Sequence, residues 1–181
     1  TLSFINYVHN PNDPTSISSD FINSIYQDSF GNVWIGTIDG LNLYNELTDS
    51  FIHFKHDQND ENTISGNIIT TIFEDSKNII WVGTLNNGLN AYDRDSGEFR
   101  RFTHSSSDPN TISHNKIWSM FEDDRGIFWV GTHGFGLNRY DRVREEFTRY
   151  TNDPNDPNSI SDNFINVIRQ DNDGNMWVGT I

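Results

Sequence analysis

The strongest constraint on the fold is a five-residue phrase that occurs four times along the chain. It reads VWIGT, IWVGT, FWVGT and MWVGT, and its tryptophans recur every 47 or 48 residues, at Trp34, Trp81, Trp129 and Trp177. A second phrase keeps the same spacing, with isoleucines at Ile17, Ile64, Ile112 and Ile160. Two independent markers in one register indicate that the chain is built of tandem structural repeats.

Within each repeat, apolar and polar residues alternate with the period of two that is typical of β-strands. A first segment such as IITTIFED leads through an Asp-rich turn into WVGT, a third segment carries a Tyr, and a fourth carries two aromatic residues three positions apart. Four short strands in about 48 residues predict one blade of a β-propeller. The predicted fold is therefore an all-β propeller of about four repeats, with three complete blades and a split one.

We expect residues 1–181 to form a single partial propeller domain. Residues 1–15 correspond to the last strand of a preceding blade, residues 16–60, 61–108 and 109–156 to three complete blades, and residues 157–181 to the first half of a fourth. The first segment and the last half-blade can then complete each other within one chain, as a four-bladed ring, or between two chains. A homodimer or other self-association is favoured, because four blades require stronger curvature.

The Asp-rich turns allow two interpretations. The stretch DNDGN at 171–175 has the composition of a calcium loop, but the strand that follows holds no acid, and only the first Asp recurs in every repeat. A hairpin turn is favoured, in which that Asp caps backbone N–H groups and a Gly or Asn takes a left-handed conformation. No metal site is predicted. The repeated tryptophans are expected to fill the space between adjacent blades rather than to stack on a sugar.

Charge and composition narrow the possible functions. Twelve Lys and Arg against 26 Asp and Glu give a formal net charge of −14, which disfavours binding to nucleic acid or to an anionic membrane. The chain has no cysteine, and its six histidines are scattered, with His53 and His56 expected to be solvated at the outer edge of a blade. With no catalytic constellation in view, we predict neither an enzyme nor a cofactor.

The unit I-x-x-I-F-E-D-x-x-G-x-x-W-V-G-T, followed by G-L-N-x-Y-D and F-x-x-Y, resembles the two-component-regulator propeller repeat over essentially the whole chain. The resemblance implies a fragment of the periplasmic sensor region of a Bacteroides-type hybrid two-component histidine kinase. In that family the input is often a breakdown product of a polysaccharide. The chain itself carries no kinase motif, no signal peptide and no apolar run long enough for a membrane span.

A ligand site is expected where the repeats differ from one another, at one end of the central channel. The loops after the second strands and one position of the first strands supply the candidates: Asp39, Asn86, Asn87, His133 and Phe135, with Asn23, Trp118 and Asn166. Side chains of these types hydrogen-bond to sugars and stack on them. The competing interpretation is that these are solvated loops without a ligand.

Three functions therefore remain open on the sequence. The favoured one is a propeller that senses a small molecule or oligosaccharide. The second is a set of architectural or dimerisation blades with no ligand site. A carbohydrate-active propeller enzyme is the least favoured, because two carboxylates facing each other across a pocket cannot be located in the sequence.

Overall fold

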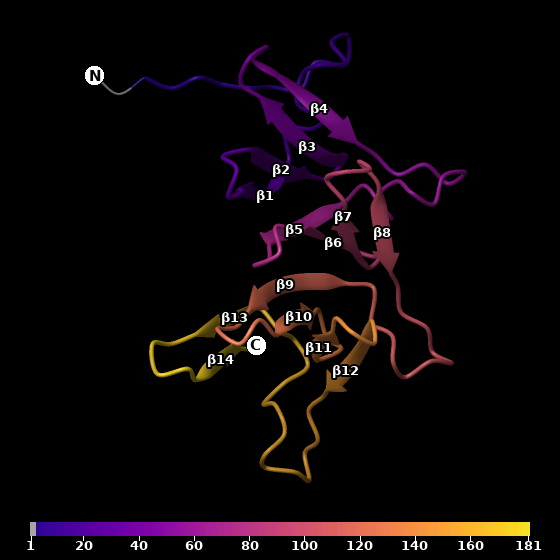
Figure 1. The fold of residues 1–181 in the computed structure, drawn as a ribbon, viewed down its shortest axis with the longest axis vertical. Coiled ribbons are helices and arrows are strands. Elements are labelled where there is room, and N and C mark those ends of the chain that lie inside the picture. Colours follow the sequence, from indigo (N-terminus) through magenta and orange to yellow (C-terminus); the bar gives the residue numbers. More distant parts are fainter. Residues whose placement is uncertain (1–2) are drawn as a thin grey trace.

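The computed structural model describes residues 3–181, which form an arc of consecutive antiparallel sheets (Figure 1). Three sheets have four strands and the last has two, and the strands of each sheet follow the order of the chain. Residues 3–181 contain no helix, and hence none that is long and apolar enough to cross a membrane. The predicted all-β propeller architecture is confirmed.

The blades are numbered along the chain. Blade 1 contains β1 (Ile22–Gln27), β2 (Val33–Thr37), β3 (Gly40–Asn45) and β4 (Ser50–Phe54). Blade 2 contains β5 (Ile69–Glu74), β6 (Ile80–Thr84), β7 (Leu89–Tyr92) and β8 (Phe99–Phe102). Blade 3 contains β9 (Ile117–Glu122), β10 (Phe128–Thr132), β11 (Leu137–Asp141) and β12 (Glu146–Tyr150). Blade 4 contains β13 (Val167–Gln170) and β14 (Met176–Gly179).

The N-terminal segment differs from its expected role as a complete last strand. Residues 1–2 lie outside the described residues, and residues 3–10 form no strand, because no strand of a preceding blade lies beside them to supply hydrogen bonds. Tyr7 nevertheless packs edge-to-face on Phe51 of blade 1, with ring centroids 5.3 Å apart. Phe54 packs on Phe99 of blade 2 in the same way, at 5.6 Å. Tyr7 therefore occupies the position of a fourth-strand aromatic residue.

The arc is open. Blade 1 and blade 4 lie at its two ends, and the N-terminal segment extends away from blade 1 rather than toward blade 4 (Figure 1). Within residues 3–181, no strand pairing joins residues 3–10 to blade 4. The four-bladed ring closed within one chain, which was one of the two expected closures, is therefore not formed.

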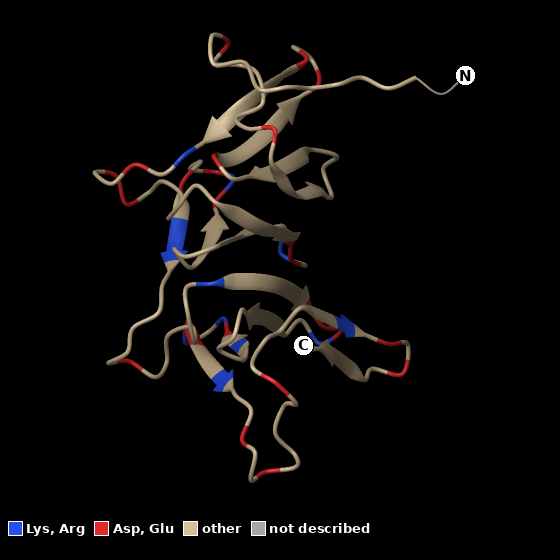
Figure 2. Cartoon of the chain, turned by 180° about the vertical axis from the view of Figure 1, so that it is seen from behind, with Lys and Arg blue, Asp and Glu red and all other residues tan. Residues whose placement is uncertain are grey.

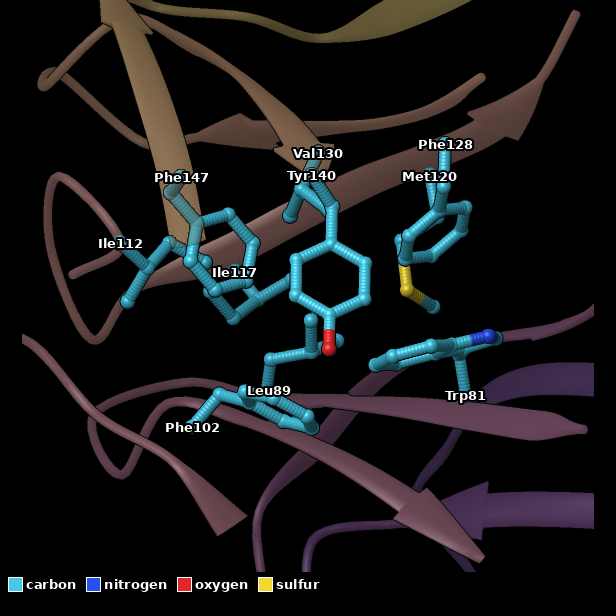
Figure 3. Packing of buried hydrophobic residues seen from close by; sticks show 10 residues of the cluster. All are labelled: Trp81, Leu89, Phe102, Ile112, Ile117, Met120, Phe128, Val130, Tyr140 and Phe147. Atoms are coloured by element: carbon cyan, nitrogen blue, oxygen red, sulfur yellow. The ribbon is translucent and has the colours of Figure 1, made fainter. Parts of the chain in front are cut away.

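Trp34, Trp81 and Trp129 lie between blades, as predicted, whereas Trp177 is exposed. Trp81 on β6 stacks on Phe128 of blade 3 with ring centroids 4.6 Å apart, and Tyr140 meets it edge-on at 5.5 Å. Figure 3 shows Tyr140 reaching from blade 3 into the space between Trp81 and Leu89 of blade 2. The buried residues of the two sheets thus form one continuous core across the blade boundary.

A glycine two residues after each of Trp34, Trp81 and Trp129 allows the blades to approach closely. A Cβ atom on Gly83 of β6 would lie 2.7 Å from Cγ2 of Ile117 on the inner strand of blade 3. In the same way, a Cβ atom on Gly36 would lie 2.6 Å from Cγ2 of Ile69, and one on Gly131 would lie 2.5 Å from Cγ2 of Ile165. Because these separations are below van der Waals contact, any side chain here would push the neighbouring inner strand away.

The Asp-rich segments are hairpin turns, as predicted. In blade 2, Oδ1 of Asp75 accepts hydrogen bonds from the N–H groups of Lys77 (2.9 Å) and Ile79 (3.0 Å). Asn78 at the fourth position has a left-handed φ of 63°, where the other turns have a glycine. The structure adds one contact that was not predicted, since Oδ2 of Asp75 accepts the indole N–H of Trp81 at 2.7 Å. The same carboxylate–indole bond occurs in the other three repeats.

The indole bond has a measurable consequence at Asp171. Hydrogen bonds from the Trp177 indole, and then from Asn175, stabilise the charged carboxylate and lower the pKa of Asp171 to about 2. Because the folded pKa is depressed, its contribution to stability is present above the unfolded pKa of about 4 and is lost as pH falls through about 2. We expect an NMR titration of this carboxyl carbon to give a midpoint near 2. In a Trp177→Phe variant the midpoint should rise, and a wild-type midpoint near 4 would contradict the structure.

Of the two histidines of β4 and the following loop, which were expected to be solvated, His56 is exposed and His53 is half-buried, and both also bind the linkers. Nδ1 of His56 lies 2.9 Å from the carbonyl oxygen of Ile64, and Nε2 of His53 lies 2.7 Å from that of Ser16. A carbonyl oxygen only accepts, so each ring nitrogen must carry a proton. Both imidazoles therefore fix the polar linkers that run between blades.

Two arginines join neighbouring blades through buried carboxylates. Arg142, which follows β11, lies 2.7 Å from Asp75 of blade 2 and 2.9 Å from Glu122 of its own blade. We call an arginine with its two carboxylates an arginine staple. The other staple consists of Arg94, Asp28 and Glu74. Because the carboxylates are almost completely buried, these ion pairs are part of the blade interface rather than of the surface.

Candidate functional site

The predicted site residues of blades 1 and 2 make local contacts. Asp39, in the loop after β2, forms an ion pair with Lys55 at 2.6 Å. The Asn87 side chain covers Gly66, where a Cβ atom would lie 2.4 Å from the amide oxygen, and Asn86 is exposed. These loops therefore present polar groups that are partly engaged by their own blades.

The inner-strand position links neighbouring blades in the first half of the arc. The amide of Asn23 donates to the carbonyl oxygen of Ile69 at 2.8 Å. The equivalent residue of blade 2, Thr70, donates its hydroxyl to the carbonyl oxygen of Ile117 at 2.7 Å. Asn166, the equivalent residue of blade 4, is exposed. At this position Asn23 thus bridges two inner strands.

Blade 3 breaks this pattern and brings aromatic residues together at the end of the inner strands. Trp118 takes the same position on β9 and lies 4.9 Å, centroid to centroid, from the His133 ring in the loop after β10. His133 in turn meets Phe164, which precedes β13, edge-on at 4.8 Å. We call Trp118, His133 and Phe164 the rim cluster. It spans the boundary between blades 3 and 4.

Backbone pairing holds the rim cluster in place. His133 and Phe164 form an antiparallel bridge, and the His133 N–H donates to the carbonyl oxygen of Lys116 at 3.0 Å. Gly134, with φ of 88°, lets the loop turn directly over the Phe164 ring, which a Cβ atom there would approach to 3.3 Å. Trp118 is 41% exposed and Phe164 36% exposed. The rings are therefore fixed by the fold while keeping faces and edges open to solvent.

A second group of aromatic rings is formed by residues that lie close in sequence to those of the rim cluster. Phe135 stacks almost parallel on His114, with centroids 3.6 Å apart and an angle of 6° between the planes, and His104 lies 6.1 Å further on. Nδ1 of His114 accepts the Lys116 N–H at 3.1 Å, so its proton is on Nε2. Burial, followed by the charges of His104 and Lys116, lowers the pKa of His114. We call these three rings the histidine stack.

The two groups suit a neutral ligand with a flat apolar face. The indole and phenyl rings offer stacking surfaces, while imidazole N–H groups and the amides of nearby loops offer hydrogen bonds. Acidic residues lie mainly in turns and connecting loops, so the field around the molecule opposes anionic ligands (Figure 2). Of the predicted site residues, the structure brings Trp118 and His133 into contact and places Phe135 in the same loop.

A large cavity lies elsewhere. It has a volume of about 650 Å³, lies between the outer strands of blades 2 and 3, and is lined by Arg94, Arg100 and Arg142 among others. Each of these arginines is ion-paired, with Arg100 held by Glu145. The three arginines are therefore engaged by carboxylates, although, within residues 3–181, Lys77 in the lining is not. We place the candidate site at the rim cluster instead, because its aromatic rings are held with faces open to solvent.

The predicted site residues do not include three members of these groups, Phe164, His104 and His114. Phe164 comes from the next repeat, and its equivalents Phe21, Ile68 and Lys116 share no chemistry that marks the position as a site. His104 lies at the end of a blade, where its Nδ1 makes the same linker contact as that of His56. A repeat alignment read for exposed aromatic residues, rather than for polar ones, would have identified Phe164.

The meander blades, the Asp–Trp turns and the packing of three tryptophans on the next sheet define a β-propeller built of tandem repeats. The profile of the two component regulator propeller family matches residues 16–39, 63–86, 111–134 and 159–181, which together make up more than half of the chain. The chain therefore belongs to the two component regulator propeller family. No curated protein sequence matches it significantly.

Solved structures support the same assignment. The extracellular domain of a hybrid two-component system from Bacteroides thetaiotaomicron is 26% identical, with a TM-score of 0.81 over 91% of this chain. This chain spans 23% of the length of that domain. Virginiamycin B lyase from Staphylococcus aureus shares the fold at 16% identity, with a TM-score of 0.62 over 88% of this chain and 49% of the lyase. The family model that the repeats match describes a regulator repeat.

Proposed function

We propose that this chain is a ligand-sensing part of the periplasmic region of a hybrid two-component sensor kinase, and that it binds a neutral carbohydrate at the rim cluster. The observation that carries the proposal is the fixed, half-exposed aromatic group at Trp118, His133 and Phe164 in a chain of the two component regulator propeller family. The family supports the sensor role. The ring chemistry supports the ligand class, because aromatic faces pack on the C–H faces of sugar rings.

Stacking on Trp118 gives a direct test. We expect at least one neutral di- or trisaccharide from a panel of glucose, galactose, mannose and xylose oligomers to bind the chain in isothermal titration calorimetry. Replacing Trp118 with alanine should weaken that binding about tenfold, which corresponds to the ~1.4 kcal/mol of an aromatic contact.

The matched control is Phe30→Ala. Phe30 is 65% exposed and lies in the turn between β1 and β2, at the opposite end of the strands from the rim cluster. Its loss should leave the affinity unchanged. If no sugar of the panel binds, or if both variants weaken binding equally, the carbohydrate proposal fails. The assignment to the two component regulator propeller family does not depend on this result.

A second candidate function is architectural, and it is supported by a different observation. Large apolar side chains are exposed on both ends of the arc, with Ile25 at 67% and Trp177 at 64%. Blades of this kind hold neighbouring blades or a second molecule and need no ligand of their own. Under this alternative, substitutions at the rim cluster would leave signalling by the full receptor unaffected.

A further inference from the structure

The cavity between the outer strands of blades 2 and 3 is widened at a position where the repeats differ. In blade 2, Ala91 on β7 pairs with Trp81 on β6, and both residues line the cavity. In blade 1 the residue paired with Trp34 is Leu43, which packs against the core cluster that contains this tryptophan. Blade 2 thus has an alanine in place of a leucine at this cross-strand position, and space is left beside the Trp81 indole.

The mouth of the cavity differs from the preceding boundary in a similar way. Between blades 1 and 2, the ring of Phe30 in the β1–β2 turn lies under the guanidinium group of Arg94, which is 4.9 Å from the ring centroid. The equivalent residue of the β5–β6 turn is Lys77, which is exposed and lines the cavity. The boundary between blades 2 and 3 therefore keeps a volume of about 650 Å³, which is typical of small-molecule sites.

Tyr140 of blade 3 brings an unused hydroxyl group to this cavity. The residue lines the cavity and is 6% exposed, and Figure 3 shows its hydroxyl pointing from blade 3 toward Trp81 of blade 2. In blade 1 the equivalent hydroxyl, on Tyr44, donates to Asp49 at 2.8 Å. In blade 3 the position of that acceptor holds Glu145, whose carboxylate binds an arginine instead. Within residues 3–181 the Tyr140 hydroxyl thus has no hydrogen-bond partner, and a ligand can supply one.

Two opposite charges lie at the mouth of the cavity. Lys77 and Asp95 are exposed lining residues, and in the described part of the chain neither side chain forms an ion pair. Their turns lie side by side, because Nε of Arg94 donates to the carbonyl oxygen of Asn78 at 3.0 Å. The arginines of the lining are paired with carboxylates, and Asp93 accepts the Asp95 N–H within its own turn at 2.8 Å. An ammonium and a carboxylate group thus remain available at the opening of an aromatic cavity.

We propose that this cavity binds a free aromatic amino acid, with its ring inside and its charged groups at the mouth. The ring lies against Trp81 and Tyr140 in the space beside Ala91, the carboxylate of the ligand pairs with Lys77, and its ammonium group pairs with Asp95. Such a zwitterion has no net charge, so the formal charge of −14 on the chain does not oppose it. The Tyr140 hydroxyl favours a ring that carries its own hydrogen-bonding group, as in tyrosine or tryptophan, over phenylalanine.

The test is isothermal titration calorimetry of the 181-residue chain with free tyrosine, tryptophan and phenylalanine. Tyrosine and tryptophan should bind about fivefold more tightly than phenylalanine, and Tyr140→Phe should remove that preference. Ala91→Leu, which introduces the residue of blade 1, should weaken all three ligands by about tenfold or more, because the leucine fills the space of the ring. Lys77→Met should weaken tyrosine binding about tenfold. Arg125→Met, at the equivalent turn position of blade 3 and outside the cavity lining, should leave it unchanged.

Ligand analogues test the two charged contacts separately. Tyramine lacks the carboxylate and hydroxyphenylpropionate lacks the ammonium group, so each should bind more weakly than tyrosine. Lys77→Met should not weaken tyramine further, and Asp95→Asn should not weaken hydroxyphenylpropionate further. The inference is overturned if none of the three amino acids binds, if Ala91→Leu binds them as the wild type does, or if both analogues match tyrosine. Because none of these variants touches the rim cluster, the result is independent of the carbohydrate proposal.

Discussion

Replacing Trp81 with alanine is expected to lower the free energy of unfolding by ~3–5 kcal/mol, the usual cost of deleting a large buried aromatic side chain. Trp81 is 2% exposed and fills the boundary between blades 2 and 3, where it contacts the rings of Phe102, Phe128 and Tyr140. Its loss also leaves Oδ2 of Asp75 without the indole N–H. Urea denaturation followed by circular dichroism measures the change.

The same substitution at Trp177 is the matched control. This residue has the same strand position and the same carboxylate bond, to Asp171 at 2.8 Å, but its ring is 64% exposed. At a concentration where the chain is monomeric, Trp177→Ala should therefore lower the unfolding free energy by much less than Trp81→Ala. Equal losses at the two positions would mean that the indole stabilises its own hairpin rather than the boundary between blades.

The contrast between these tryptophans shows how far the sequence determines the fold. The repeat period and the alternation of apolar residues predicted the meander blades, the hairpin turns and the placement of tryptophan between sheets. These features are local or periodic, so they can be predicted from the sequence of one strand and of its equivalents in the other repeats. Residues 3–10 differ because a strand also needs a partner to pair with, and pairing is not a property of the segment alone.

Polar residues inside the fold were harder to predict. Asn90 is completely buried, where its Oδ1 accepts the Ser65 N–H and its amide donates to the Val82 carbonyl oxygen. In the sequence it recurs with Asn42 and Asn138 in the G-L-N motif of each complete repeat, but the motif does not tell whether the residue is internal. The rim cluster is similar, since Phe164 reaches Trp118 and His133 from the following repeat. Contacts of this kind depend on which blade lies beside which, and only the folded arc supplies that information.

The last prediction concerns such a contact. Replacing Arg142 with methionine keeps most of the apolar stem but removes the charge that lies between blades 2 and 3. The Asp75 side chain has no exposed surface and that of Glu122 is 8% exposed, so both carboxylates would remain buried without their counter-ion. We expect a loss of ~3–5 kcal/mol in the free energy of unfolding, measured by urea denaturation. Arg125→Met, at a residue that is 68% exposed and 4.0 Å from Asp124, should change it by less than ~0.5 kcal/mol.

The chain itself contains the compensating change. Glu122 caps the turn of the preceding blade by accepting a hydrogen bond from the Ser76 hydroxyl at 3.0 Å. One blade later, Gln170 caps the corresponding turn by accepting the Asp124 N–H at 2.8 Å. A glutamine thus also caps the turn, and in blade 1 Gln27 occurs with Glu46 rather than an arginine at the repeat position of Arg94 and Arg142. Adding Glu122→Gln to Arg142→Met should therefore recover ~1–2 kcal/mol, because one buried charge is removed while the cap remains. If the double variant is no more stable than Arg142→Met, the loss comes from packing of the arginine stem and not from unpaired charge.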